Sequence, residues 1–156
     1  MNFVPSTMLG AGRSILAILG GIGLVSLVTQ LLETTLVGAA AGGQVTDMAH
    51  YFEVRNRPSI LAAGLVYNTV AGVLGGYMTA RIAGQHEMAH ARMAALVLTA
   101  SLIYGFTAGE YARFTPAWMR IALIMLTGPA MLAGAMVRAR AAKAERLEPE
   151  AQSLTD

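Results

Sequence analysis

Long apolar stretches separated by short polar segments dominate the pattern of hydrophobic and polar positions along the chain. Crossing the hydrocarbon core of a bilayer takes about 20 mostly apolar helical residues, because only a backbone that satisfies its own hydrogen bonds is tolerated there. Four stretches meet this requirement, at about 14–38, 58–81, 91–109 and 116–138. The pattern therefore predicts an all-α polytopic membrane protein whose four transmembrane helices form a compact bundle.

Proline, glycine and threonine mark several ends of these stretches. Pro58 and Pro116 suit the first turn of a helix, where a missing N–H group costs nothing, and Thr115 is a candidate N-cap. Gly84 can end the second helix by adopting a positive φ angle. The polar segment between the first two spans is long enough for a short surface helix, whereas a tight turn joins the last two.

The composition agrees with a membrane location. Only 13% of the residues are charged and 55% are hydrophobic, whereas soluble domains carry about a quarter charged residues. The formal net charge is +2, but the basic residues are scattered in ones and twos, which is not the pattern of a nucleic-acid-binding face. Cysteine is absent, and no span carries a histidine pair suited to haem. We expect no cofactor and no nucleic-acid partner.

The distribution of basic residues predicts the orientation. Four spans place both termini on one side, and that side holds seven of the basic residues, namely Arg13, Arg81, Arg92, Arg138, Arg140, Lys143 and Arg146. The other side holds Arg55, Arg57, Arg113 and Arg120. By the positive-inside rule, both termini are expected in the cytoplasm of a bacterial inner membrane. Residues 1–140 then form the transmembrane domain, with a retained first helix, and 141–156 form a polar, flexible cytoplasmic tail.

The stretch GQHEMAHARM contains the His-Glu-x-x-His motif of many zinc proteases. His86 and His90 would share one face of a helix, and Glu87 could activate a metal-bound water molecule. A polar helix boundary explains the same residues without a metal, since Glu87 in a first turn favours the helix dipole and histidine suits the headgroup region. We expect no metal site here.

A third zinc ligand is hard to place. Glu110 follows His90 at the separation of thermolysin-like proteases, but the predicted third span lies between them, and about 20 helical residues extend over about 30 Å. Site-2 proteases add an aspartate from another membrane helix. This chain has only Asp47, in the outer loop, and Asp156, at the last position.

A group of polar residues is predicted at similar depth in the outer half of the membrane. It comprises Gln30, Glu33, Tyr67, Asn68 and Tyr104, with Thr69 and Ser101 nearby. An ionisable residue inside a span is usually paired or functional. The group could form an intramembrane hydrogen-bond network, bind a small polar ligand, or carry protons. Alternatively, Glu33 lies near the interface and pairs with one of the four outer arginines, while Gln30 and Asn68 bond between helices.

Small residues predict where helices approach closely. The candidates are Gly20, Gly23, Gly72, Gly76 and Gly134. Glycine lets the backbones of two membrane helices come near each other, either within the bundle or against another protein.

Two stretches carry a resemblance to other proteins. GGYMTARIAG, followed by a short polar turn that contains histidine, resembles the end of the second helix in small uncharacterised four-helix bacterial inner-membrane proteins. The PAW and GPAMLAG segments of the fourth span are similar to theirs. The resemblance covers roughly 60–137 and implies a four-span fold, but it brings no known activity and no functional residue.

These observations favour a non-catalytic integral membrane subunit that contacts the lipid bilayer and packs against membrane-protein partners in a larger complex, such as a respiratory or photosynthetic assembly. One alternative is a small transporter or proton-linked protein that uses Glu33 and Asn68. A remote alternative is a zinc metalloprotease acting through His86, Glu87 and His90.

Overall fold

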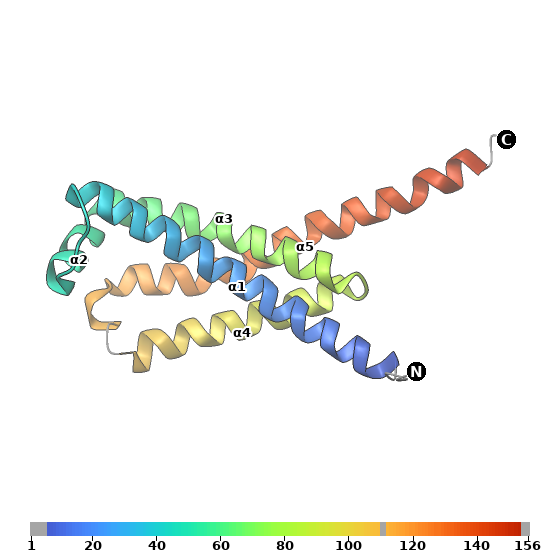
Figure 1. Cartoon of the computed structure of the whole chain (residues 1–156), viewed down its shortest axis with the longest axis horizontal. Helices are drawn as coiled ribbons and strands as arrows, with labels where there is room; N and C mark the ends of the chain where they lie inside the picture. Colours follow the sequence, from blue (N-terminus) through green and yellow to red (C-terminus); the bar gives the residue numbers. More distant parts are fainter. Residues whose placement is uncertain (1–5, 110–111, 154–156) are drawn as a thin grey trace.

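The computed structural model describes residues 6–109 and 112–153. They form the helices α1 (Ser6–Ala41), α2 (Met48–Arg55), α3 (Pro58–Ala83), α4 (Glu87–Ala108) and α5 (Ala117–Ser153), with a 3-10 turn, η1 (Ala112–Phe114), before α5 (Figure 1). No strand occurs in these ranges. The all-α fold is as predicted from the sequence.

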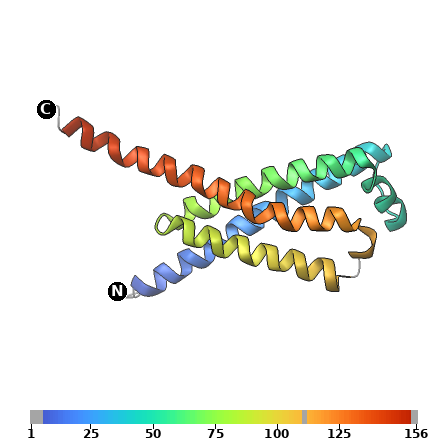
Figure 2. The same cartoon turned by 180° about the vertical axis from the view of Figure 1, so that it is seen from behind.

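Four of the helices are long and apolar enough to cross a membrane. The qualifying segments are Gly10–Ala41, Pro58–Ala83, Glu87–Ala108 and Ala117–Glu145. The four long helices are as predicted, and their length and composition are those of a multi-pass membrane protein. The start of α1 and the end of α5 lie at the same end of the bundle, together with the α3–α4 turn, and α2 lies at the opposite end (Figures 1 and 2).

The helix ends follow local chemistry. Pro58 occupies the first turn of α3, and Gly84 ends that helix with a φ angle of 64°, as predicted. The carboxylate of Asp47 accepts a hydrogen bond from the backbone N–H of His50 at 2.8 Å and so caps α2. The short surface helix considered for this loop is therefore present.

The start of the last helix differs from the prediction in detail. Pro116 lies just before the first residue of α5, and its carbonyl group accepts the N–H groups of Met119 and Arg120. The hydroxyl oxygen of Thr115 accepts a hydrogen bond from Arg55 at 3.1 Å. Thr115 thus contributes to a contact between α2 and the turn before α5, a role that its position in the sequence did not suggest.

Helix α3 occupies the centre of the bundle, where it packs against α5 and α1, and α4 packs mainly against α5. The crossing of α3 and α5 is close because it contains three of the predicted glycines. A Cβ atom at Gly72 would lie 2.9 Å from that of Ala130, and one at Gly76 or Gly134 would overlap the backbone of the facing helix. These three glycines therefore pack against neighbouring helices of the same bundle, which is the first of the two alternatives considered for them.

The other predicted glycines have smaller roles in this packing. A Cβ atom at Gly20 would lie 3.1 Å from the side chain of Ile82, and one at Gly23 would meet no described atom within 4 Å. The close contact between α1 and α3 is instead made by Gly21 and Gly75, where an added Cβ would come within 2.8 Å of the opposite carbonyl oxygen.

Helix α5 continues beyond the last apolar segment to Ser153. Figures 1 and 2 show this part leaving the bundle as a projecting helix. Arg138 donates a hydrogen bond to Glu145 at 3.1 Å along it. The segment is rich in alanine, arginine, lysine and glutamate, which favour helix, so the structure has a helix where the sequence analysis expected a flexible tail.

Candidate functional site

Glu33 is the centre of a polar cluster at the α2 end of the bundle. Its Oε1 atom accepts hydrogen bonds from Arg55 Nε at 2.7 Å and from the Tyr51 hydroxyl at 2.8 Å. Its Oε2 atom accepts one from the Tyr67 hydroxyl at 3.0 Å. We call these four residues the Glu33 cluster. It joins α1, α2 and α3.

The placement of the cluster depends on α2. The Asp47 cap sets the first turn of this helix, and residues four apart on a helix share one face. Tyr51 and Arg55 therefore both face α1, and Val54 on the same short helix is fully buried. The loop between the two spans folds back over the bundle and supplies two of the three partners of Glu33.

A second set of contacts ties α2 to the turn before α5. Arg55 Nη1 donates to the Thr115 hydroxyl oxygen at 3.1 Å, and Asn56 Nδ2 donates to the carbonyl oxygen of Phe114 at 2.7 Å. The rings of Phe52 and Phe114 are stacked, with their centroids 4.9 Å apart. Arg55 thus connects the carboxylate on α1 with the start of the last span.

The cluster is largely screened from solvent. The side chains of Arg55 and Glu33 are 13% and 21% exposed, so their opposite charges attract each other more strongly than on an open surface. Burial, together with the hydrogen bond to Glu33, raises the pKa of Tyr51 far above its usual range. The Tyr51 hydroxyl therefore keeps its proton at neutral pH and acts as a donor.

Of the five residues predicted for the polar group, only Glu33 and Tyr67 come together. Gln30 Nε2 donates to the hydroxyl oxygen of Thr34, and Asn68 Nδ2 donates to the Gly64 carbonyl oxygen, in both cases one turn away on the same helix. Tyr104 is 73% exposed. Because neighbouring residues on a helix point about 100° apart, Tyr67 and Asn68 cannot face the same partner.

The alternative in which Glu33 pairs with an outer arginine is correct in that pairing, and the partner is Arg55. Its other part is wrong, because Gln30 and Asn68 bond within their own helices and not between helices. The other three outer arginines have different contacts. Arg57 donates to the Ala40 carbonyl oxygen, Arg113 lies over the ring of Phe114, and Arg120 donates to the Phe106 carbonyl oxygen. Sequence reasoning missed Tyr51 as a ligand of the carboxylate. Tyr51 lies four positions before Arg55 in the polar outer loop, and this helical spacing could have predicted that both side chains face Glu33.

The histidine motif lies at the other end of the bundle. His86 has a φ angle of 48° and is the residue before α4, and Glu87 is the first residue of that helix. Both ring nitrogens of His90 have protein neighbours, with Nδ1 3.1 Å from the carbonyl oxygen of His86 and Nε2 2.9 Å from Ser14 Oγ. A metal at His90 would have to displace one of these contacts.

No metal-binding constellation is formed in the part of the chain that the structure describes. Within those ranges, no three histidine, cysteine, aspartate or glutamate residues lie close enough to hold an ion. Of the other ligands weighed for zinc, Glu110 and Asp156 lie outside the described residues, and Asp47 caps α2 at the opposite end of the bundle.

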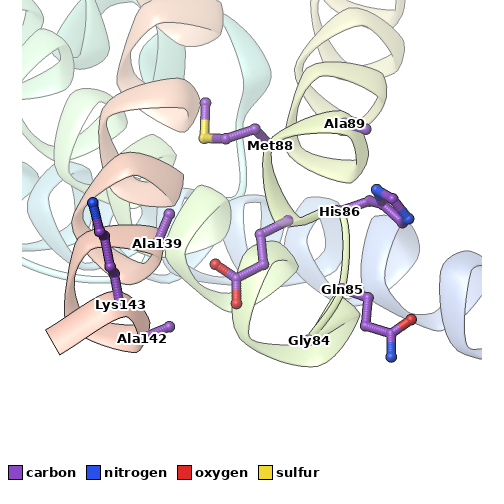
Figure 3. Close-up of a pocket in the computed structure, with 9 residues that line it drawn as sticks. Gly84, Gln85, His86, Met88, Ala89, Ala139, Ala142 and Lys143 are labelled. Atoms are coloured by element: carbon purple, nitrogen blue, oxygen red, sulfur yellow. The ribbon is translucent and has the colours of Figure 1, made fainter. Parts of the chain in front are cut away.

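An open hollow of about 760 Å³ adjoins the motif, between the α3–α4 turn and α5. Figure 3 shows His86 and Lys143 on opposite sides of it, with Ala139 and Ala142 on the α5 wall. Glu87 also lines it. The hollow is open on one side, whereas ligand sites are usually enclosed pockets that bury most of the ligand.

No known protein family, no curated protein and no solved structure matches this chain.

Proposed function

We propose that this protein is a non-catalytic subunit of a larger complex in the bacterial inner membrane, such as a respiratory or photosynthetic assembly. In this proposal its apolar faces contact lipid and the helices of partner proteins, and both termini lie in the cytoplasm. The observation that carries the proposal is a groove lined largely by small residues on the surface of the bundle, between α4 and α5.

This groove has a volume of about 380 Å³ and is lined by Ala95, Leu96, Thr99, Ala100, Ile103 and Gly128. Four of the lining residues are small, and the other two, Leu96 and Ile103, are exposed apolar residues. Association of membrane helices depends on close van der Waals contact, and small residues allow a facing helix to approach. A ridge of larger side chains on a partner helix fits such a groove.

The contacts of Glu33 support a structural role over the transporter alternative. Both of its oxygens accept hydrogen bonds from protein donors. Asn68, the other residue of that alternative, bonds to its own helix. Towards the other end of the bundle, Thr79 likewise donates to the carbonyl oxygen one turn before it on α3. A proton route would need polar groups in series, as intramembrane relays have.

The positions of the basic residues support the orientation. Arg13 near the start of α1, Arg81 and Arg92 on either side of the α3–α4 turn, and Lys143 on the projecting part of α5 occupy the end of the bundle that carries the termini. Positive residues accumulate on the cytoplasmic side of inner-membrane proteins.

Purification from native membranes in a mild detergent tests the proposal. We expect the chain to co-purify with defined membrane-protein partners in fixed stoichiometry. Ala100→Leu, which fills the groove, should abolish this co-purification, whereas Ala62→Leu, the same change at an exposed position of α3, should leave it intact. Recovery of a monomer or homodimer that conducts ions in liposomes would overturn the proposal and favour the transporter alternative.

A further inference from the structure

A cavity of about 320 Å³ opens beside the Glu33 cluster, between α1, α2, α4 and η1. Glu33, Tyr51 and Arg55 form its polar wall, and Leu102, Gly105 and Phe106 of α4 form the opposite wall. The subunit function proposed above does not use this cavity. We propose that it binds a neutral, membrane-soluble molecule by a carbonyl oxygen.

Unused hydrogen-bond donors on Arg55 supply the first argument. A guanidinium group carries five N–H donors. Here Nε donates to Glu33 and Nη1 donates to Thr115, while Nη2 makes no hydrogen bond to any described residue. Arg55 lines the cavity. A ligand with an acceptor oxygen can therefore bond to the remaining donors without breaking the contacts of Arg55 with the protein.

The charges of the wall determine the class of ligand. Arg55 Nε and Glu33 Oε1 are 2.7 Å apart, so the cation next to the cavity is already neutralised. An anion would be repelled by the adjacent carboxylate, and a cation would be repelled by the guanidinium. Moving either ion out of water also carries a large cost. A neutral acceptor, such as the oxygen of a ketone or an ester, avoids both penalties.

The opposite wall provides room for an apolar body. Leu102 and Phe106 present aliphatic and aromatic surface, and a Cβ atom built at Gly105 would meet no described atom within 4 Å. Small-molecule sites typically have volumes of about 300–1,000 Å³ and combine apolar walls with a few polar groups. The cavity matches the lower end of this range, so it can hold the carbonyl-bearing part of a ligand but not a whole lipid.

Two membrane components share this chemistry, namely the carbonyl oxygens of a quinone ring and those of the ester linkages in a diacyl lipid. The purified full-length chain would be titrated with a decyl-substituted benzoquinone and, separately, with diheptanoylglycerol, an uncharged diacyl lipid. The ether-linked analogue of that lipid, which lacks carbonyl oxygens, serves as the chemical control. We expect saturable binding of at least one carbonyl probe and none of the ether analogue.

Gly105→Leu tests the location of the site. The side chain would extend into the cavity from a position with free space, and replacing glycine within a helix favours the helical backbone. We expect about a ten-fold or greater loss of affinity, because the added group occupies the ligand's volume. Gly23→Leu is the matched control, since a Cβ there also meets no described atom and the residue does not line the cavity. Its affinity should stay within about two-fold of the wild type.

Binding of the quinone alone identifies the ligand as a quinone, and binding of the diacyl lipid alone identifies it as a lipid ester. Binding of both shows that the site recognises the carbonyl group that they share. The proposal is overturned if neither carbonyl probe shows saturable binding, or if the ether analogue binds as well as the ester. It is also overturned if Gly105→Leu unfolds cooperatively on heating, as a folded protein does, and still binds with wild-type affinity. If Gly105→Leu does not fold, Ser101→Leu provides the same test, because Ser101 also lines the cavity and its hydroxyl donates only to the Val97 carbonyl oxygen of its own helix.

Discussion

The side chain of Arg55, on the short helix α2, donates from Nε to Oε1 of Glu33, on the long apolar helix α1, at 2.7 Å. The two residues are 22 positions apart in the sequence. The same carboxylate accepts hydrogen bonds from Tyr51 and Tyr67. This pairing holds the outer loop against the bundle, and the paired side chains form one wall of the cavity.

Neutralising Glu33 should destabilise the protein by removing the partner of a largely buried cation. We expect Glu33→Gln to lower the free energy of unfolding by about 1–3 kcal/mol. Arg55→Met should have a similar effect, and the double variant should lose less than the sum of the two because the residues are in contact. Reversible unfolding in mixed micelles measures these values. Strict additivity would contradict a direct interaction.

Removing the Tyr51 hydroxyl should cost about 1 kcal/mol of stability, the usual contribution of one hydrogen bond. Tyr51→Phe leaves Glu33 with Arg55 and Tyr67 as donors, so the fold should persist. Tyr104→Phe is the control, because Tyr104 is exposed and lies outside the Glu33 cluster, and its effect should stay within about 0.5 kcal/mol. Equal effects of the two changes would argue against the placement of Tyr51.

Adding one methyl group at the α3–α5 crossing should be strongly unfavourable. Gly76→Ala forces the new methyl group against the Met131 carbonyl group, so the helices must separate. We expect a loss of about 1–3 kcal/mol or more. Gly23→Ala has free space around its Cβ, so it should be neutral or stabilising, as alanine favours helix over glycine by about 1 kcal/mol. The yield and melting temperature of the two variants in detergent provide the comparison.

The absence of cysteine from the chain allows a direct test of orientation. Gln44, in the α1–α2 loop, and Gln85, in the α3–α4 turn, are both exposed glutamines at opposite ends of the bundle. A membrane-impermeant thiol reagent should label Gln44→Cys from the periplasmic side and Gln85→Cys only after the membrane is opened. The reverse pattern would place the termini in the periplasm.

The zinc alternative predicts that the purified protein carries stoichiometric zinc, and the contacts of His90 argue against this. Its ring nitrogens lie next to Ser14 Oγ and the His86 carbonyl oxygen, so we expect the purified protein to carry zinc well below one equivalent. His90→Ala should leave that content unchanged. Stoichiometric zinc that disappears in His90→Ala would establish a metal site.

The sequence by itself determined the number and approximate limits of the long apolar helices. Length and apolar character are properties of each segment alone, because any backbone in a bilayer must satisfy its hydrogen bonds locally. The ends at Pro58 and Gly84 were predictable for the same reason, since each depends on the φ angles available to one residue. The pairing of Glu33 with an outer arginine was foreseen as one alternative among several.

Only the tertiary structure decided which residues meet. Apolar side chains surround the spanning helices on all sides, so hydrophobic periodicity does not show which face is turned inward. Gly21 and Gly75 contact each other whereas Gly23 faces open space, although all three lie in glycine-rich stretches. Likewise, Arg55 rather than Arg57 reaches Glu33 because the capped helix α2 turns one side chain towards α1 and directs the other to the Ala40 carbonyl group. These choices depend on the rotation of each helix about its axis, and packing between helices sets that rotation.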